Sequence, residues 1–388
     1  METSDVDQDQ QIVVAMSRPF GASASDRSSA SLYDDVGDRL NNILPMFGLE
    51  GCSADVLSAY RIIFEGSLHR PSGAAWPQPS RLNRDGTPIQ FSLVLGLDAA
   101  DLQFLGEAGE SDLSDAERMK VSRRSISSLS ALLRVEKQLE LVSELIDASC
   151  RVNPLDLHPD HGGTFWIGAS FSSKGNAALK IYINGKKGTE SESWSRFEEF
   201  VRYFGASKSW QETKKLLDGK MKPLGMAITL GKDSLPKGRL YLGGYGNRAS
   251  YYEGLLEYCE GGSVASAFSQ FTACMLGNDS KYPTQSAVFS VAAADGELVD
   301  PKMEFCAHCL FRDDQQAFDA CSRWLQFRKI DPDLYSRLLN ALSGQIHHSP
   351  ASVHVYVGLG WRQRREHTTI YLKPDLGHRE SRTTQVHQ

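Results

Sequence analysis

The sequence predicts an α+β protein in which about ten antiparallel strands close into a barrel and helices pack against its outside. Three patterns predict this fold. Strand-like runs come in pairs, helical periodicity fills the segments between pairs, and one short polar-aromatic pattern recurs about every 60 residues, which is typical of a repeated supersecondary unit. Closure is expected because a barrel has no exposed sheet edges and gives every repeat the same inward face.

The helical segments each carry one apolar stripe, as expected for helices that cover a sheet. They are Leu32–Phe47, Ala54–Leu68, Asp115–Ile146, Trp194–Leu217, Tyr251–Leu276 and Asp313–Leu342. The last segment should break near Asp331 and Pro332, because proline removes a helical hydrogen bond.

The strand-like runs are rich in β-branched and aromatic residues, and Gly, Asp, Asn or Lys turns separate the two members of each pair. Each pair therefore predicts an antiparallel hairpin. The pairs are Ile89–Leu95 with Leu102–Gly106, Phe165–Phe171 with Leu179–Ile183, Met226–Leu230 with Arg239–Leu242, Ala287–Ala292 with Met303–Cys309, and Val353–Leu359 with Thr368–Leu372. We expect a single barrel domain over residues 31–376, and disordered polar tails at residues 1–30 and 377–388.

The composition is that of an ordinary globular protein, with 388 residues, 41% hydrophobic residues and a formal net charge of −6. Mild acidity and the lack of a long basic stripe argue against a nucleic-acid partner. The sequence has no run of apolar residues long enough to span a membrane and no secretory signal, so we expect a cytoplasmic protein with no membrane partner. The seven cysteines are expected to be reduced thiols.

Four segments place a polar residue two positions before a Tyr or Glu: Lys180-Ile-Tyr182, Lys237-Gly-Arg239-Leu-Tyr241, Lys302-Met-Glu304 and Thr369-Ile-Tyr371. Because side chains alternate across a strand, residues two apart share a face. Each segment should therefore aim a cation or hydroxyl and an aromatic ring or carboxylate at the centre of the barrel.

Three of these segments, within Leu179–Asn184, Gly238–Leu242 and Thr369–Leu372, follow Pro79–Leu93 in an order and spacing that resembles a known family. The family is the soluble aromatic prenyltransferases of the dimethylallyltryptophan synthase type, which have the ABBA barrel, and the bacterial indole and tryptophan enzymes are the most similar. The resemblance implies an allylic diphosphate donor, usually dimethylallyl diphosphate, and an aromatic small-molecule acceptor such as tryptophan or another indole. It implies no required cofactor, with magnesium at most stimulatory, and we expect a monomer or homodimer.

The residues suit that chemistry. Lys180, Lys237 and Arg239 supply positive charge for a diphosphate leaving group. Tyr182, Tyr241 and Tyr371 can pack their rings around an allyl cation and keep water away from it.

The sequence also departs from the family pattern. Gln90 stands where the family has a Glu that anchors the acceptor N–H, and Gln103 stands where it has a diphosphate-binding Arg, a loss for which Lys302 could compensate. Glu304 replaces an aromatic or His and could be the base that rearomatises the product or a new acceptor anchor, although a one-residue slip would place Phe305 there. Near Ile167, where many relatives have a Lys or His base, no base is evident. These changes leave open a non-indole acceptor, cyclisation of the prenyl chain, or a degenerate barrel that only binds a hydrophobic ligand.

Three clusters could be read as metal sites, but each has a simpler explanation. Asp34, Asp35 and Asp38 lie where a helix should begin, and carboxylates are favoured at a helix N-terminus. His158, Asp160 and His161 precede a Gly-Gly turn and are expected in a solvated loop. Cys306, His308 and Cys309 are expected on one strand, where Cys309 would face away from the other two, so we predict packing and no metal site.

Overall fold

The computed structural model describes residues 31–70, 80, 82–96, 100–110, 113–150, 165–186, 188–217, 219–260, 264–277, 281–283, 286–343 and 353–376. The expected tails at 1–30 and 377–388 lie outside these residues, as do His158, Asp160 and His161.

Ten strands close into one antiparallel barrel in the order β1-β10-β9-β8-β7-β6-β5-β4-β3-β2, which confirms the predicted fold. All five predicted hairpins are present. Their strands are β1 (Ile89–Leu95), β2 (Asp101–Gly106), β3 (Phe165–Ser172), β4 (Ala177–Asn184), β5 (Met221–Gly231), β6 (Lys237–Gly244), β7 (Ala287–Ala294), β8 (Glu297–Cys306), β9 (His354–Arg362) and β10 (Arg365–Leu372). The prediction is wrong at the end of β8, where residues Ala307–Leu310 form the short helix α10 and do not continue the strand.

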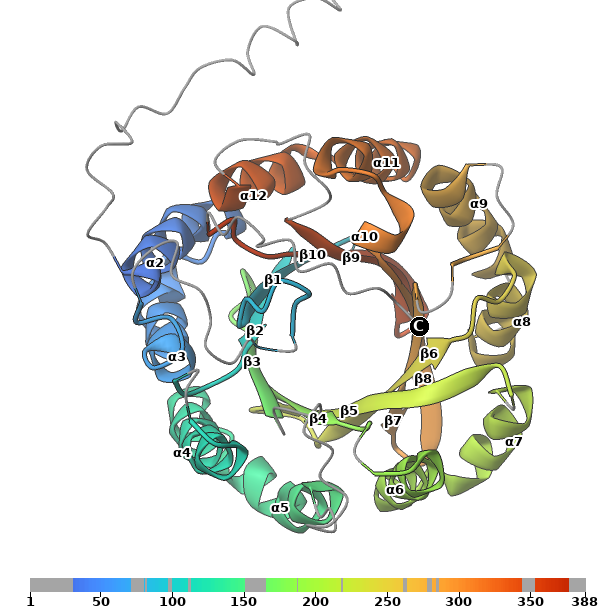
Figure 1. The fold of residues 1–388 in the computed structure, drawn as a ribbon, viewed down its shortest axis with the longest axis horizontal. Helices are drawn as coiled ribbons and strands as arrows, with labels where there is room; N and C mark the ends of the chain where they lie inside the picture. The colour runs from blue at the N-terminus through green and yellow to red at the C-terminus, as the bar shows by residue number, and fades with distance from the viewer. Residues whose placement is uncertain are drawn as a thin grey trace, which may run out of the picture.

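The helices form a ring around the outside of the barrel (Figure 1). They are α2 (Leu32–Ile43), α3 (Ser53–Phe64), α4 (Asp115–Leu133), α5 (Glu136–Cys150), α6 (Glu190–Tyr203), α7 (Ser207–Leu217), α8 (Ala249–Glu260), α9 (Val264–Leu276), α11 (Asp314–Phe327) and α12 (Asp333–Ser343), with 3-10 turns η2 (Leu44–Phe47) and η3 (Glu50–Cys52). The longer predicted segments each contain two helices. Arg134 ends α4 with a left-handed φ of 58°, Gly205 separates α6 from α7 with a φ of 75°, and the expected break near Pro332 separates α11 from α12.

The apolar face of the sheet points outward and packs under the helices. Gly238 shows this on β6, because a Cβ added there would lie 2.5 Å from the Phe204 ring and 2.6 Å from the Phe200 ring, next to α6. On β10, the Thr368 hydroxyl accepts a hydrogen bond of 2.8 Å from the Trp324 indole of α11. Their neighbours Arg239 and Thr369 therefore face the interior.

None of the helices in the described ranges combines the length and the hydrophobicity that crossing a membrane requires.

Candidate active site

The four polar-aromatic segments lie on β4, β6, β8 and β10, which all run in the same direction because neighbouring strands are antiparallel. A two-residue step along each strand therefore leads toward the same end of the barrel and advances by about 6 to 7 Å. The first position of each segment faces the half of the interior near the hairpin turns, and the Tyr or Glu faces the half near the helix connections. This arrangement creates a cationic layer next to an aromatic one.

In the cationic layer, Lys180 and Arg239 each have a neutral partner. Lys180 Nζ donates a hydrogen bond of 2.5 Å to Gln103 Oε1, and Arg239 donates one of 3.1 Å to the hydroxyl of Ser290. Gln103 therefore lies in this layer. Burial, followed by repulsion from Arg362, Lys302 and Arg239, lowers the pKa of Lys180 to about 7. An amine held this close to other cations favours an anionic ligand.

Two further residues of this layer, Arg362 and His367, were missed by the sequence analysis. Arg362 lies 3.1 Å from Asp101 and ends β9, beyond the predicted end of that strand at Leu359. His367 lies two residues before Thr369, so extending the same alternation by one step could have found it. Burial, then the charges of Lys302, Arg362 and Arg239, lower the pKa of His367 to about 2, which keeps it neutral.

Lys237 lies apart from this group. It is the first residue of β6 and shares the inward face with Arg239, but it is exposed at the barrel rim.

A three-membered network joins Lys302, Glu304 and Tyr371 across β8 and β10. Lys302 Nζ lies 2.8 Å from Glu304 Oε1 and 2.7 Å from the Tyr371 hydroxyl, and that hydroxyl also donates to Glu304. Burial alone would raise the pKa of Glu304, but attraction to Lys302 and donation from Lys302 and Tyr371 outweigh it and hold the pKa below its usual range. The network thus contains a buried carboxylate whose charge Lys302 balances.

The alternative alignment with Phe305 facing inward is excluded. The Phe305 ring stacks on Tyr282 at a centroid distance of 4.2 Å and contacts Phe268 and Phe271 of α9, so it points outward. Glu304 is the inward residue.

The aromatic layer contains the three predicted tyrosines and two residues that the sequence analysis missed. The Tyr182 and Tyr241 rings lie 6.0 Å apart, and Tyr371 meets Tyr356 of β9 edge to face at 6.1 Å. Trp166 of β3 pairs directly opposite Tyr182. Burial raises the pKa of Tyr182 to about 12, so its phenol is neutral at physiological pH.

Gln90 lies on β1 and is buried, with 4% of its surface exposed. Its Nε2 has no hydrogen-bond partner within the described ranges, and the same holds for the indole nitrogen of Trp166. Buried donors of this kind are normally satisfied, so both are available to a ligand. Ile167 belongs to the outward apolar core, so it contributes nothing to the interior.

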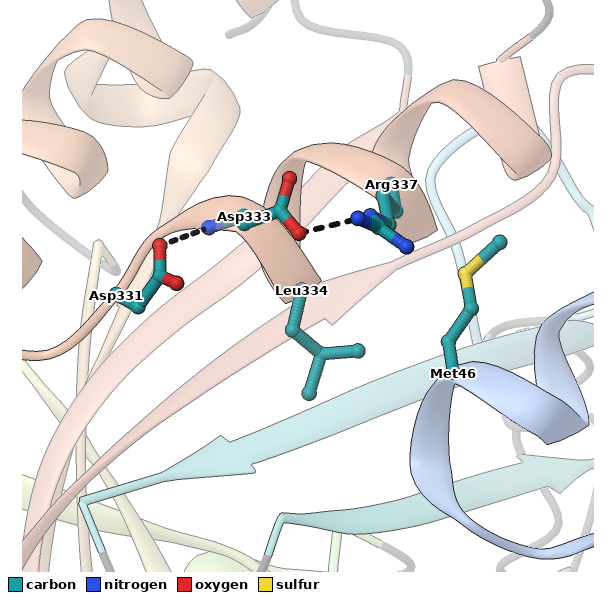
Figure 2. A pocket seen from close by; sticks show the side chains of 5 residues that line it. All are labelled: Met46, Asp331, Asp333, Leu334 and Arg337. Carbon is teal, nitrogen blue, oxygen red and sulfur yellow. Dashed lines mark hydrogen bonds and ion pairs between the residues drawn. The ribbon is translucent and has the colours of Figure 1, made fainter.

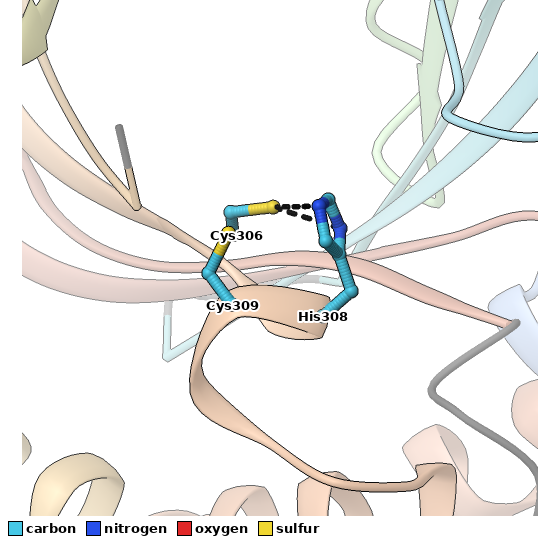
Figure 3. A group of neighbouring side chains, drawn as sticks. All are labelled: Cys306, His308 and Cys309. Carbon is cyan, nitrogen blue, oxygen red and sulfur yellow. Dashed lines mark hydrogen bonds between the residues drawn. The ribbon is translucent and has the colours of Figure 1, made fainter. Parts of the chain in front are cut away.

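The cysteine cluster differs from the prediction. Cys306 ends β8, and the helical turn of α10 brings Cys309 back toward Cys306 and His308 (Figure 3). The three possible ligand atoms lie within 4.8 Å of one another, so the expected divergence of Cys309 is wrong. Hydrogen bonds from Cys306 and His308 lower the pKa of the Cys309 thiol to about 5.

The remaining candidates lie on the outside of the barrel. Asp34 and Asp35 occupy the first turn of α2, where Ser31 caps the helix and Asp35 pairs with Arg39 at 2.7 Å, as predicted for a helix start. A shallow hollow beside α12 is lined by Met46, Asp333 and Arg337 among others (Figure 2). Arg337 and Asp333 pair there at 2.8 Å, and Asp331 accepts a hydrogen bond from the backbone N–H of Asp333.

Comparison of the sequence with protein-family models and with curated proteins finds no match. Solved structures do match. The chain is similar to a 6-dimethylallyl tryptophan synthase with a TM-score of 0.79 and 18% identity, over 90% of this chain and 98% of that one. A 5-dimethylallyl tryptophan synthase from Streptomyces coelicolor, in complex with DMASPP and Trp, matches with a TM-score of 0.78 and 20% identity over 89% and 96% of the two chains. AnaPT from Neosartorya fischeri matches with a TM-score of 0.70 and 14% identity over 90% and 96%. These similarities establish that the chain has the same fold, the ABBA barrel.

Proposed function

We propose that this protein is an aromatic prenyltransferase that moves a prenyl group, dimethylallyl in the simplest case, from an allylic diphosphate to an aromatic acceptor. The observation that carries the proposal is the layer of Lys180, Arg239 and Arg362 directly beside the layer of tyrosines inside a closed barrel. The similarity to solved dimethylallyl tryptophan synthases supports it.

In the proposed mechanism, the cationic layer holds the diphosphate, and Lys302 and Gln103 contribute to it. The carbon–oxygen bond of the donor breaks heterolytically, its electron pair leaves with the diphosphate, and fixed positive charge in a site of low dielectric stabilises that leaving group. Lys237, at the rim, would attract the donor more than it would stabilise the departing charge. This step needs no metal, because the protein itself supplies the positive charge.

The tyrosines would then protect the allyl cation. Each neutral ring of Tyr182, Tyr241 and Tyr371 presents a π face to the cation, which contributes on the order of 1 to 2 kcal/mol when water is excluded. An aromatic carbon of the acceptor attacks the cation, and the new carbon–carbon bond leaves a proton on that ring carbon. Glu304 takes this proton and restores aromaticity.

Two candidate classes of acceptor follow from the residues present. An indole such as tryptophan would donate its N–H to the Gln90 carbonyl. In a phenol, or in another substrate with an oxygen or nitrogen lone pair, that atom would instead accept a hydrogen bond from Gln90 Nε2, which has no partner among the described residues. The second candidate depends on the N–H donor of the Gln90 amide, because an ionised carboxylate at the same position could only accept hydrogen bonds.

The test is a matrix of donors and acceptors. We would incubate the protein with dimethylallyl, geranyl and farnesyl diphosphates, with tryptophan, indole or a phenol, and with or without EDTA, and measure product mass and diphosphate release. Prenylated product in EDTA is the expected result. Release that requires added magnesium would contradict the metal-independent mechanism, and binding of a hydrophobic ligand with no release under any condition would identify a degenerate barrel.

A further inference from the structure

The cluster of Cys306, His308 and Cys309 plays no part in the proposed prenyl transfer and lies at the end of the barrel where β8 meets α10 (Figure 3). Two facts of the chain build it. Alternation along β8 gives Cys306 the same inward face as Glu304, and the strand changes to a helical turn directly after Cys306. Residues three apart lie on the same side of a helical turn, so Cys309 returns to the cluster.

The distances are close to those of a shared metal ion. Cys306 Sγ lies 2.9 Å from His308 Nδ1, and all three ligand atoms fall within 4.8 Å of one another. With zinc–sulfur bonds of about 2.3 Å and zinc–nitrogen bonds of about 2.0 to 2.1 Å, the ligand atoms of a tetrahedral site would lie roughly 3.3 to 3.8 Å apart. Small side-chain rotations would bring the cluster into that range.

The ligand chemistry selects the class of metal. Thiolate and imidazole ligands favour zinc and related thiophilic ions over magnesium or calcium, which prefer oxygen. Two thiolates would balance the charge of a divalent ion. We propose that Cys306, His308 and Cys309 form a zinc site with three protein ligands and one open coordination position.

The location gives the ion a positioning role. Cys306 pairs across the sheet with Tyr356, and Tyr356 packs edge to face against Tyr371, which hydrogen-bonds to Glu304. A metal that ties α10 to the last residue of β8 would fix this side of the aromatic layer. The site does not depend on the proposed transferase activity, because metal binding is measured without any donor or acceptor.

The experiment uses the full-length protein, purified with a reductant and freed of metal by dialysis. We would titrate it with Co²⁺ and follow thiolate-to-cobalt charge-transfer absorption and the visible bands of tetrahedral cobalt, and then displace the cobalt with Zn²⁺. We expect one ion per chain and a rise in the thermal midpoint on addition of zinc, since a ligand that binds only the folded state stabilises it.

The variants Cys309→Ser and His308→Ala should weaken metal affinity at least about tenfold, because even outer-shell partners of metal ligands contribute that much. Cys274→Ser is the matched control, because this free cysteine on α9 lies outside the cluster, and it should bind cobalt like the wild type. His308→Ala also keeps both thiols, so a failure of folding after loss of a cysteine would not obscure the result.

Three outcomes would overturn the proposal. The first is the absence of charge-transfer absorption in the reduced wild-type protein. The second is equal metal affinity in the wild type and both cluster variants. Recovery of a Cys306–Cys309 disulfide by mass spectrometry, from protein that binds no metal, would identify the pair as a redox couple and would equally exclude the zinc site.

Discussion

Binding of diphosphate should be coupled to proton uptake by Lys180. In the free protein, burial and the neighbouring cations lower the pKa of this amine to about 7, far below its usual value of 10.5. A diphosphate in the cationic layer adds opposite charge close to the amine, which favours the protonated form and raises the pKa again. The protein must therefore gain a proton when it binds the anion at a pH above 7.

The size of the effect follows from the two protonation states. With a pKa of about 7, only about a tenth of the Lys180 side chains carry a proton at pH 8 in the free protein, so binding should take up about 0.9 proton. At pH 6 about nine-tenths are already protonated, and the uptake by Lys180 should fall to about 0.1 proton.

The assay is calorimetric titration with inorganic diphosphate in buffers of different ionisation enthalpy, because the dependence of the measured enthalpy on the buffer gives the number of protons. The matched variant is Lys180→Arg, whose guanidinium stays charged at either pH and so binds the anion without this uptake. Protons exchanged by the ligand itself cancel in the difference between the two proteins. Equal proton uptake in the wild type and Lys180→Arg at pH 8 would refute the reasoning.

Three other perturbations test separate parts of the structure. Arg239→Ala should lower kcat/KM by about 100-fold or more, because it removes a group that stabilises the leaving anion. The control is Lys232→Ala, which removes an exposed cation from the adjoining hairpin turn and should retain activity. Equal activity of the two variants would remove Arg239 from the site. If Glu304 is the base, Glu304→Gln should reduce turnover strongly with little change in donor affinity. A change confined to KM for the acceptor would instead show that Glu304 binds the acceptor and is not the base. Asp314→Ala should lower the free energy of unfolding by about 3 kcal/mol, because Asp314 Oδ1 lies 2.7 Å from the buried His354 Nδ1. The exposed Asp319→Ala on the same helix should unfold like the wild type in denaturant titrations, and an equal loss in both variants would contradict this explanation.

The period-two pattern was sufficient to predict the parts of the site that lie in the middle of strands. Side chains alternate between the two faces of a strand, so an apolar outer face determines which residues face inward. This places Lys180 and Tyr182 of β4, and Arg239 and Tyr241 of β6, on the inward face. The pattern left Glu304 and Phe305 as alternatives, and the structure decides between them, because the Phe305 ring belongs to the outer core.

The residues that were missed lie at strand ends or depend on contacts between strands. Arg362 and His367 fall in the parts of β9 and β10 beyond the predicted bounds, and boundaries depend on pairing with neighbours that the local sequence does not contain. Tyr356 has a polar residue, His354, two positions before it, but the pairing of β9 with β10 shifts register at this point, and His354 contacts Asp314 of α11 while Tyr356 meets Tyr371. The convergence of Cys309 with Cys306 required knowledge that the chain turns into a helix at Ala307.

The strict division of each strand into an outward and an inward face separates the residues that the fold requires from those that determine the chemistry. In Lys302-Met303-Glu304, the middle residue is fully buried among the outer apolar side chains, and its two neighbours face the interior. Substitution at 302 or 304 therefore changes charge in the interior while the contact between barrel and helices stays intact. A scaffold of this kind can change its inward residues without disturbing the contact between barrel and helices, and chains with about one residue in five in common share its architecture.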